Sequence, residues 1–365
     1  ASDVYKRQLL ISRKGIITLV KGNVVVGQSG GPTSVINSSL VGVFKAAKDA
    51  GVEKIYGMRN GIEGFLNKKV VDMSEYVKNE LDIELLKRTP SSFLGTCRFK
   101  LPSVEESEAT YKLLFSIMEE LDIKYFFYIG GNDSMDTIKK LSNYAEEIGS
   151  DIRFMGVPKT IDNDLAVTDH TPGYGSAAKY IASALKEIIR DVNTYPTESV
   201  TVVEIMGRNA GWLTAAAALS RAEDCPGPDL IYLPEVTFDY DRFLEQVKAV
   251  KKKKTSVVIA VSEGIKLANG EYVCEDNKQA TFEDSFGHKS LGGTALYLAD
   301  FIGANLGVKS RGIVFSTLQR CASHIVSRRD ITEAFMAGSE AVQAALNGET
   351  GKMIIFTRTS NEPYN

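Results

Sequence analysis

Residues 156–164 read GVPKTIDND, and this stretch is the most informative part of the chain about its structure and chemistry. It continues an apolar run, 152–157, that ends at a proline, which is the pattern of a loop leaving a buried strand. The loop carries two carboxylates, Asp162 and Asp164, close behind one lysine, Lys159. A carboxylate in such a loop can accept a proton from a substrate hydroxyl, and a lysine beside it can bind a phosphate. The stretch therefore indicates phosphoryl transfer.

The composition is that of an ordinary soluble protein, with 365 residues of which 44% are hydrophobic and 24% charged. This length allows two domains with sizeable cores. The formal net charge of −3 argues against nucleic acid as the main partner, because phosphate backbones attract basic surfaces. No apolar stretch reaches the roughly 18 residues that suggest a membrane helix. The 4 cysteines form no CxxC pair, which favours a reducing compartment and a cytoplasmic protein.

Short apolar runs alternate with longer helical patterns, which favours βα units, an α/β fold and a parallel sheet. The run YFFYI at 125–129 is too apolar for any strand that is not buried. We predict strands at 23–26, 53–56, 125–129, 154–157, 200–205, 230–233, 256–261 and 311–315. We predict helices at 35–50, 104–121, 134–148, 176–193, 211–221 and 330–347.

Two further loops, both rich in glycine, follow predicted strands. In GQSGGPT, 27–33, Gly30 and Gly31 would let backbone amides approach an anion at a helix start. The spacing matches neither a dinucleotide fingerprint nor a P-loop, so a tight turn explains this loop equally well. In GGNDS, 130–134, the acid Asp133 suggests a divalent metal or the exclusion of another group. Helix capping by Asn132 or Asp133 is the alternative.

The three loops together are stronger evidence for a ligand site than any one of them, because ligands bind at the carboxyl ends of strands in open parallel sheets. An Asx-rich turn would explain 163–164 alone, but not three anion-handling loops after successive strands. Arginines near other strand ends suit a sugar phosphate, since the planar guanidinium matches phosphate oxygens. A surface ion pair remains the alternative for each arginine. These residues are Arg208, Arg311 and Arg320, with the acid Glu263 after another strand.

Together these segments resemble the phosphofructokinases, and within that family the pyrophosphate-dependent branch. The segments are GQSGGPTSVIN, GTCRFKLP, GGNDSMDT, VPKTIDND, TPGYGSA, VEIMGRNAGW, SEG and LQRCASH, in the family's order from about Asn23 onward. The resemblance implies two doubly wound, Rossmann-like α/β domains with the site between them. It places the phosphoryl-donor domain at 22–173 with about 319–340. It places the sugar-phosphate domain at 174–318 with 341–365.

The resemblance also implies roles for individual residues. Asp162 is expected to be the base that deprotonates the 1-hydroxyl of fructose 6-phosphate, with Asp164 assisting. The expected pyrophosphate-binding residues are Gly30, Gly31, Arg98 and Thr160. The expected sugar-phosphate residues are Thr160, Asp162, Met206, Gly207, Arg208, Glu263, Arg311 and Arg320. Magnesium is the expected cofactor, near Asp133 and Asn132, although Asn132 replaces an acid of the family.

The choice of phosphoryl donor depends on two positions. ATP-using relatives have glycine where this chain has Asp133 and Lys159. A carboxylate at 133 would repel the α-phosphate of a nucleotide, since two like charges ~4 Å apart cost ~4 kcal/mol at a surface-like dielectric. Lys159 would neutralise charge on pyrophosphate as the bond breaks. The resemblance therefore implies reversible transfer from pyrophosphate to fructose 6-phosphate, giving fructose 1,6-bisphosphate and phosphate.

Several alternatives remain open at this stage. The donor could be ATP, the acceptor could be sedoheptulose 7-phosphate, or the chain could be a catalytically idle binding protein of the same fold. Family membership also implies a place in glycolysis and assembly as a homodimer or homotetramer.

We also make predictions for the two ends of the chain. Residues 1–8, ASDVYKRQ, lack apolar periodicity and resemble translated adaptor sequence. We expect 1–21 to be a non-native or disordered leader and the fold to begin near Asn23. The chain stops where family members continue, so we expect a truncated C-terminus.

Overall fold

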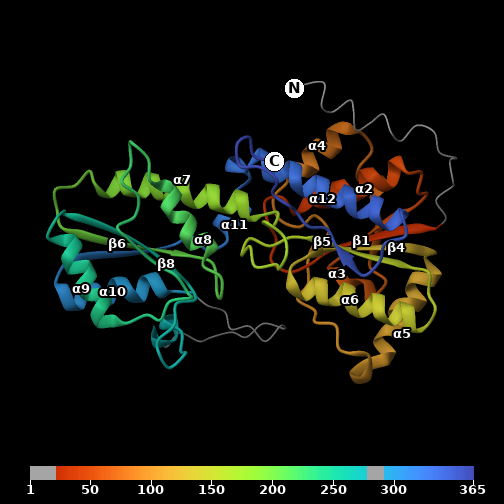
Figure 1. Ribbon diagram of the computed structural model, residues 1–365, viewed down its shortest axis with the longest axis horizontal. Helices are drawn as coiled ribbons and strands as arrows, with labels where there is room; N and C mark the ends of the chain where they lie inside the picture. The colour runs from red at the N-terminus through yellow and green to blue at the C-terminus, as the bar shows by residue number, and fades with distance from the viewer. Residues whose placement is uncertain (1–21, 278–291) are drawn as a thin grey trace.

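The computed structural model describes residues 22–277 and 292–365, which form two α/β units (Figure 1). The expected leader, 1–21, lies outside the described residues. In chain order the strands are β1 (Asn23–Gln28), β2 (Ile55–Met58), β3 (Val70–Asp72), β4 (Ile123–Gly130), β5 (Arg153–Pro158), β6 (Ser199–Ile205), β7 (Leu230–Tyr232), β8 (Ser256–Ser262), β9 (Lys309–Val314) and β10 (Lys352–Met353). The α-helices are α2 (Ile36–Asp49), α3 (Gly61–Leu66), α4 (Glu80–Arg88), α5 (Val104–Glu120), α6 (Asn132–Glu147), α7 (Tyr174–Val192), α8 (Trp212–Ala215), α9 (Tyr240–Lys251), α10 (Thr294–Leu306), α11 (Leu318–Cys321) and α12 (Arg328–Leu346).

The first unit is built on a six-stranded sheet in the order β10-β5-β4-β1-β2-β3. Its pairs are parallel except for the antiparallel pair of β2 and β3. Side chains alternate between the faces of a strand, so Val24 and Val26 pack with α2 and α12, whereas Val25 packs with α3, α5 and α6. Because both faces are covered, the central strands are mainly apolar, and YFFYI is buried as predicted apart from the partly buried Tyr125.

Helices α2 and α12 cross with their backbones in contact. A Cβ added to Gly42 would lie 2.1 Å from the carbonyl oxygen of Phe335, and one added to Gly338 would lie 2.1 Å from the carbonyl oxygen of Ser39. Only glycine allows two helices to approach so closely. This crossing anchors α12, which follows the second unit in the sequence, onto the first unit.

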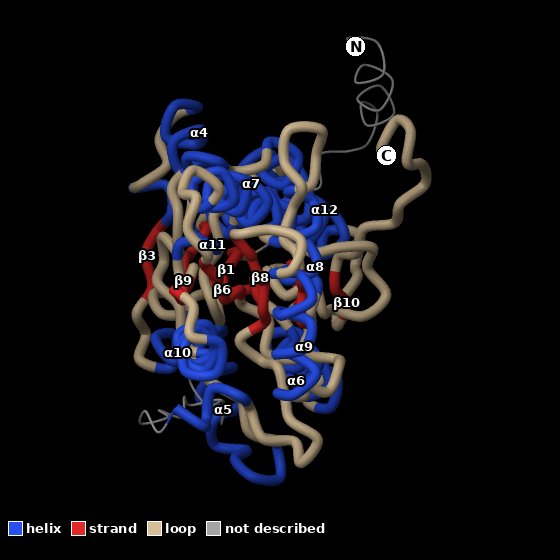
Figure 2. The backbone as a smooth tube through the Cα atoms, turned by 90° about the vertical axis from the view of Figure 1, so that its left-hand side faces the viewer, coloured by secondary structure: helices blue, strands red, loops and turns tan. Residues whose placement is uncertain are grey.

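The second unit contains a parallel four-stranded sheet in the order β7-β8-β6-β9. Helices α7 and α8 cover one face, and α9 and α10 cover the other. Figure 2 shows the strands of both units between two layers of helices, one with α7 and α12 and the other with α5, α6, α9 and α10. The expected doubly wound α/β fold is confirmed. No helix within the described ranges combines the length and the apolar character needed to cross a membrane.

The domain boundaries differ from the expected ones at the C-terminus. Strand β10 pairs with β5, and Ile354 donates a backbone hydrogen bond to Gly156 (3.2 Å), so the end of the chain joins the first sheet. The sequence expectation assigned 341–365 to the second domain. A short apolar run does not reveal which sheet edge it will join, because that depends on contacts with residues distant in the sequence.

Candidate active site

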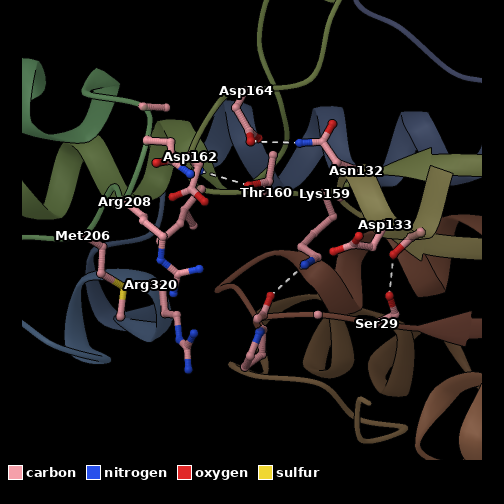
Figure 3. Close-up of a pocket in the computed structure, with 18 of the residues that line it drawn as sticks. Ser29, Asn132, Asp133, Lys159, Thr160, Asp162, Asp164, Met206, Arg208 and Arg320 are labelled. Atoms are coloured by element: carbon pink, nitrogen blue, oxygen red, sulfur yellow. Dashed lines mark hydrogen bonds between the residues drawn. The ribbon is translucent and has the colours of Figure 1, made fainter. Parts of the chain in front are cut away.

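A cavity of about 790 Å³ lies between the two units (Figure 3). It is lined by residues that follow β1, β4 and β5 of the first unit and β6 and β8 of the second, together with Arg98 from the loop between α4 and α5 and Arg320 of α11. The three loops that the sequence singled out therefore meet in one place. The lining residues include Ser29, Gly30, Gly31, Arg98, Asn132, Asp133, Ser134, Lys159, Thr160, Asp162, Asp164, Met206, Arg208, Asn209, Glu263 and Arg320.

The topology of the first sheet explains why the glycine loops meet here. The chain runs from β1 to β2 on one side and from β4 to β5 on the other, so strand order reverses between the neighbours β1 and β4. Loops at such a switch point separate and leave a crevice at the carboxyl ends of the strands. The loops at 27–33 and 130–134 emerge on either side of it.

Hydrogen bonds fasten these loops to one another. The hydroxyl of Ser29 is hydrogen-bonded to that of Ser134, and the backbone N–H of Lys159 donates to the carbonyl of Gly130 at 2.9 Å. Gly130 must lack a side chain, because a Cβ there would lie 1.9 Å from Oγ of Ser134. The two serines were missed in the sequence, where nothing distinguishes them from ordinary turn residues.

The loop that carries Arg98 is joined to the first glycine loop. The hydroxyl of Thr96 donates to the carbonyl of Gly30 at 2.7 Å, and the N–H of Gly30 donates to the carbonyl of Cys97 at 3.2 Å. Arg98 therefore reaches the cavity on a fixed backbone, although its side chain is exposed.

Lys159 is a buried cation at the cavity. Its side chain is only 3% exposed, and Nζ donates a 2.7 Å hydrogen bond to the carbonyl of Gly31. Burial, helped by the charges of Arg320 and Arg98 and opposed by that of Asp162, lowers its pKa to about 8. The ammonium thus lies against the glycine loop that is expected to bind an anion.

Asp162 and Asn163 have different positions in their loop, one at the cavity and one in the turn. The N–H of Asp162 donates to Oγ1 of Thr160 (3.1 Å), while Oδ1 of Asn163, a residue with φ 56°, accepts from the N–H of Thr171 (2.9 Å). Asn163 is therefore a turn residue that leaves Asp162 at the cavity. Burial raises the pKa of the Asp162 carboxyl; Asp164 adds to the rise, and Lys159, Arg208 and Arg320 oppose it.

Asn132, Asp133 and Asp164 form an acidic corner near Lys159. Nδ2 of Asn132 donates to Oδ2 of Asp164 at 2.9 Å. This contact lowers the pKa of Asp164, but partial burial, the larger effect, raises it. Among the described residues no three Asp, Glu, His or Cys side chains converge closely enough to hold a metal by themselves. A cation in this corner would need ligands from a bound anion or water.

The wall from the second unit carries arginines and one acid. Figure 3 shows Arg208 and Arg320 on the side opposite Lys159 and Asp133. Oε1 of Glu263 accepts a 3.3 Å hydrogen bond from the N–H of Gly207, and burial raises the pKa of this carboxyl to about 7. Burial also lowers the pKa of Arg320. Gly207 has φ 137°, and a Cβ there would lie 2.5 Å from the carbonyl of Ala210.

The structure does not bring every expected residue to the cavity. Arg311 lies within β9, where it is paired with Thr201 and exposed, and it does not line the cavity. Its position in a strand rather than after one explains the difference. Gln319, by contrast, was not singled out, yet its side chain binds the backbone of Met206.

Comparisons with known proteins agree with this geometry. A family profile described as "Phosphofructokinase" matches residues 23–345. The chain is 39% identical over 350 residues to a pyrophosphate–fructose 6-phosphate 1-phosphotransferase of Halomonas elongata, covering 95% of this chain and 82% of that protein. It is 40% identical over 346 residues to the protein of the same name from Methylococcus capsulatus, covering 94% and 81%. A crystal structure of a pyrophosphate-dependent phosphofructokinase from Nitrosospira multiformis superposes with a TM-score of 0.83 at 36% identity, covering 94% and 81%.

Proposed function

The chain belongs to the phosphofructokinase family, and we infer that it is a phosphotransferase that uses pyrophosphate as its donor. It transfers a phosphoryl group reversibly to the 1-hydroxyl of fructose 6-phosphate, giving fructose 1,6-bisphosphate and phosphate. The observation that carries this conclusion is the meeting of Lys159, Asp133 and Asp162 in one cavity between the two units. The relatives of this name cover nearly the whole chain.

In the proposed reaction, the 1-hydroxyl oxygen attacks the nearer phosphorus of pyrophosphate. The hydroxyl proton passes to the carboxylate of Asp162, a new P–O bond forms, and the bridging P–O bond breaks to release phosphate. The raised pKa of Asp162 suits a base that must hold the proton and return it when the reaction reverses. Its environment still contains three cations, which help to keep the carboxylate ionised before transfer.

Lys159 is proposed to stabilise the charge that develops on the leaving phosphate. With a pKa of about 8, its ammonium is charged at neutral pH, and it is shielded from water. A cation interacts more strongly with a nearby anion in such a site than in bulk solvent. The amides of the glycine loop at 30–31, with Arg98 and Thr160, would bind the remaining oxygens of pyrophosphate.

The sugar phosphate is proposed to bind against the second unit. Arg208 and Arg320 supply the charged hydrogen-bond donors for its phosphate, and Met206 and Glu263 border the sugar ring. Gly207, which is not among the lining residues, holds Glu263 through its N–H. Arg311 lies outside the cavity formed by the described residues, so their arrangement does not support the same role for it.

The acidic corner fits magnesium as the cofactor. Mg²⁺ is usually held by one or two carboxylates, with phosphate oxygens and water as the other ligands, which matches a corner without a three-residue protein cage. Asp133 would hold the ion with help from Asn132 or Asp164. When bound, the ion would neutralise pyrophosphate charge.

Cytoplasmic location, a role in glycolysis and assembly as a homodimer or homotetramer stay predictions from the family resemblance.

The direct test is a product assay on the purified protein with fructose 6-phosphate, magnesium and either pyrophosphate or ATP. We expect fructose 1,6-bisphosphate with pyrophosphate, its reversal with phosphate, and little product with ATP. Sedoheptulose 7-phosphate should be run as a second acceptor. Turnover with ATP but not pyrophosphate would contradict the inferred donor.

Two sets of variants assign the roles. Asp162→Asn should lose turnover by orders of magnitude yet still bind fructose 6-phosphate, whereas Asp136→Asn, on the exposed side of α6, should retain it. Unchanged turnover in Asp162→Asn would exclude this residue as the base. The double variant Asp133→Gly with Lys159→Gly should gain activity with ATP; if it stays inactive with ATP, these residues do not determine the donor.

A further inference from the structure

Gln319 has a buried carboxamide that joins two strand ends of the second unit. Its side chain is 2% exposed. Oε1 accepts a hydrogen bond from the backbone N–H of Met206 at 3.0 Å, and Nε2 donates to the carbonyl of Ser316 at 2.9 Å. Met206 directly follows β6, and Ser316 lies in the loop after β9. One side chain therefore connects the two loops that lead to Arg208 and Arg320.

The Gln319 carboxamide continues the hydrogen bonding between the β6 and β9 segments beyond the end of the sheet. The parallel ladder between β6 and β9 reaches Glu204 and Val314, and the N–H of Phe315 still donates to the carbonyl of Glu204 at 3.3 Å. Beyond that point the two chains diverge. Gln319 then supplies one acceptor and one donor, as a peptide group would, and so extends the connection by one more step.

The other side of the Met206 loop is held by the neighbouring strand β8. The hydroxyl of Ser262 donates to the carbonyl of Gly207 at 2.6 Å, and Glu263 accepts from the N–H of Gly207. The hydrogen bond from Gln319 is the matching contact from the side of β9. The loop that presents Arg208 is therefore fixed from both neighbouring strands.

The same carboxamide stabilises the turn that starts α11. Ser316 has φ 48°, a left-handed conformation that is unfavourable for a residue with a side chain. Its carbonyl is held by Gln319, and the N–H of Arg320 donates to the carbonyl of Thr317 at 3.2 Å. The turn sets the direction in which Arg320 leaves α11. That direction matters because Arg320 reaches the first glycine loop. A Cβ built on Gly31 would lie only 3.0 Å from Nη1 of Arg320.

We propose that Gln319 is a positioning residue for phosphoryl transfer, which holds Arg208 and Arg320 at the separation that one sugar phosphate requires. The proposal rests on the proposed function. Gln319 does not line the cavity and so does not touch substrate itself. A displacement of about 1 Å in groups that orient a substrate can cost roughly 100-fold in rate, so loss of this contact should be visible in kinetics.

The test replaces Gln319 with methionine, which has a similar length and no polar atoms that can make both contacts. We expect the KM for fructose 6-phosphate to rise about tenfold or more, with a smaller change in the KM for pyrophosphate. Gln246→Met is the matched control, because Gln246 also has a hydrogen-bonded carboxamide in the second unit, 2.6 Å from the hydroxyl of Tyr232, but lies away from the cavity. It should leave both KM values unchanged.

Gln319→Glu adds a readout that a merely structural role would not produce. An ionised glutamate can accept from Met206 but cannot donate to Ser316, whereas a protonated one can do both. The ratio of its kcat/KM to that of the wild type should therefore rise as the pH is lowered. This measurement decides the question even if Gln319→Met does not fold.

The outcomes distinguish failure of the proposed function from failure of the positioning role of Gln319. If the wild type shows no transfer from pyrophosphate, the proposed function fails, and binding of fructose 6-phosphate to the variants, measured by calorimetry, still tests the positioning role. Gln319→Met kinetics within twofold of the wild type, or a pH-independent ratio for Gln319→Glu, would overturn the proposal.

Discussion

Replacement of Lys159 by methionine should make the protein more stable while removing its activity. The ordinary pKa of a lysine side chain is 10.5, and that of Lys159 is about 8. Each pKa unit corresponds to about 1.36 kcal/mol, so the folded state disfavours the charged form by about 3 kcal/mol at neutral pH. Methionine removes this cost and fills similar space, but it cannot donate to Gly31, which subtracts about 1 kcal/mol. We expect a net gain of about 2 kcal/mol in the free energy of unfolding of the first unit.

The pH dependence distinguishes this explanation from a simple packing effect. A lysine whose folded-state pKa is lowered destabilises the protein fully below that pKa, and the penalty fades as the pH rises toward the unfolded-state value. The stability gap between Lys159→Met and the wild type should therefore be largest near neutral pH. It should close between about pH 8 and pH 10.5.

The assay is urea or thermal unfolding of both proteins across this pH range. Lys139→Met on α6 is the matched control, because Lys139 is exposed and should change stability by less than about 0.5 kcal/mol. Turnover should be lost in Lys159→Met and kept in Lys139→Met. The reasoning is refuted if Lys159→Met is less stable than the wild type near neutral pH, or if the gap between them does not depend on pH.

Three further predictions concern the packing around the site. Gly338→Ala should lower the free energy of unfolding by about 1–3 kcal/mol in urea unfolding, because its methyl group would collide with a backbone carbonyl of α2; unchanged stability would show that the helix crossing adapts. Asp330→Asn should lower the melting temperature, because both carboxylate oxygens of this buried residue accept hydrogen bonds at the start of α7. One of these hydrogen bonds, from the N–H of Ser176, is 2.9 Å long. An equal melting temperature would contradict this. The hydrogen bond to Glu333 (2.8 Å) raises the pKa of His170, so the pair should stabilise the fold fully below about pH 6.5 and lose this effect as the pH rises through the raised value. The melting temperatures of wild type and His170→Gln should therefore converge at high pH, and a gap that widens instead would be inconsistent with this pair.

Local patterns in the sequence were sufficient to find the main strands and the loops that follow them. The run YFFYI and the loop GVPKTIDND are each decided by neighbouring residues, so both lie where the pattern predicts. Helix α10 was missed because its sequence, TALYLADFIGANL, is apolar nearly all round and has no clear amphipathic period. The alanine-rich segment predicted as one helix at 211–221 is divided into α8 and a 3₁₀ segment, Ala216–Ser220.

Residues whose position depends on distant partners could not be predicted. Gln319 differs from an exposed glutamine only through its contacts with Met206 and Ser316, and Met206 is distant in the sequence, in the loop after β6. Arg311 presents the opposite case, because an arginine next to a strand end and one within a strand look alike until the register of β9 is known. The Ser29–Ser134 contact likewise requires β1 and β4 to be neighbours.

The charges of the cavity explain why a divalent cation belongs to the proposed reaction. The lining includes the cations Arg98, Lys159, Arg208 and Arg320, and the carboxylates Asp133, Asp162, Asp164 and Glu263. These opposing charges leave the protein with little net charge to offer two phosphorylated substrates, each of which brings about −1.5 to −2 or more at neutral pH. The arginines and the lysine can orient the phosphates through directed hydrogen bonds, but they cannot neutralise both ligands while acids occupy the same space. Mg²⁺ held partly by those acids would turn their charge from a source of repulsion into a binding site, so Asp133, the acid proposed to exclude a nucleotide, would also recruit the proposed metal ion.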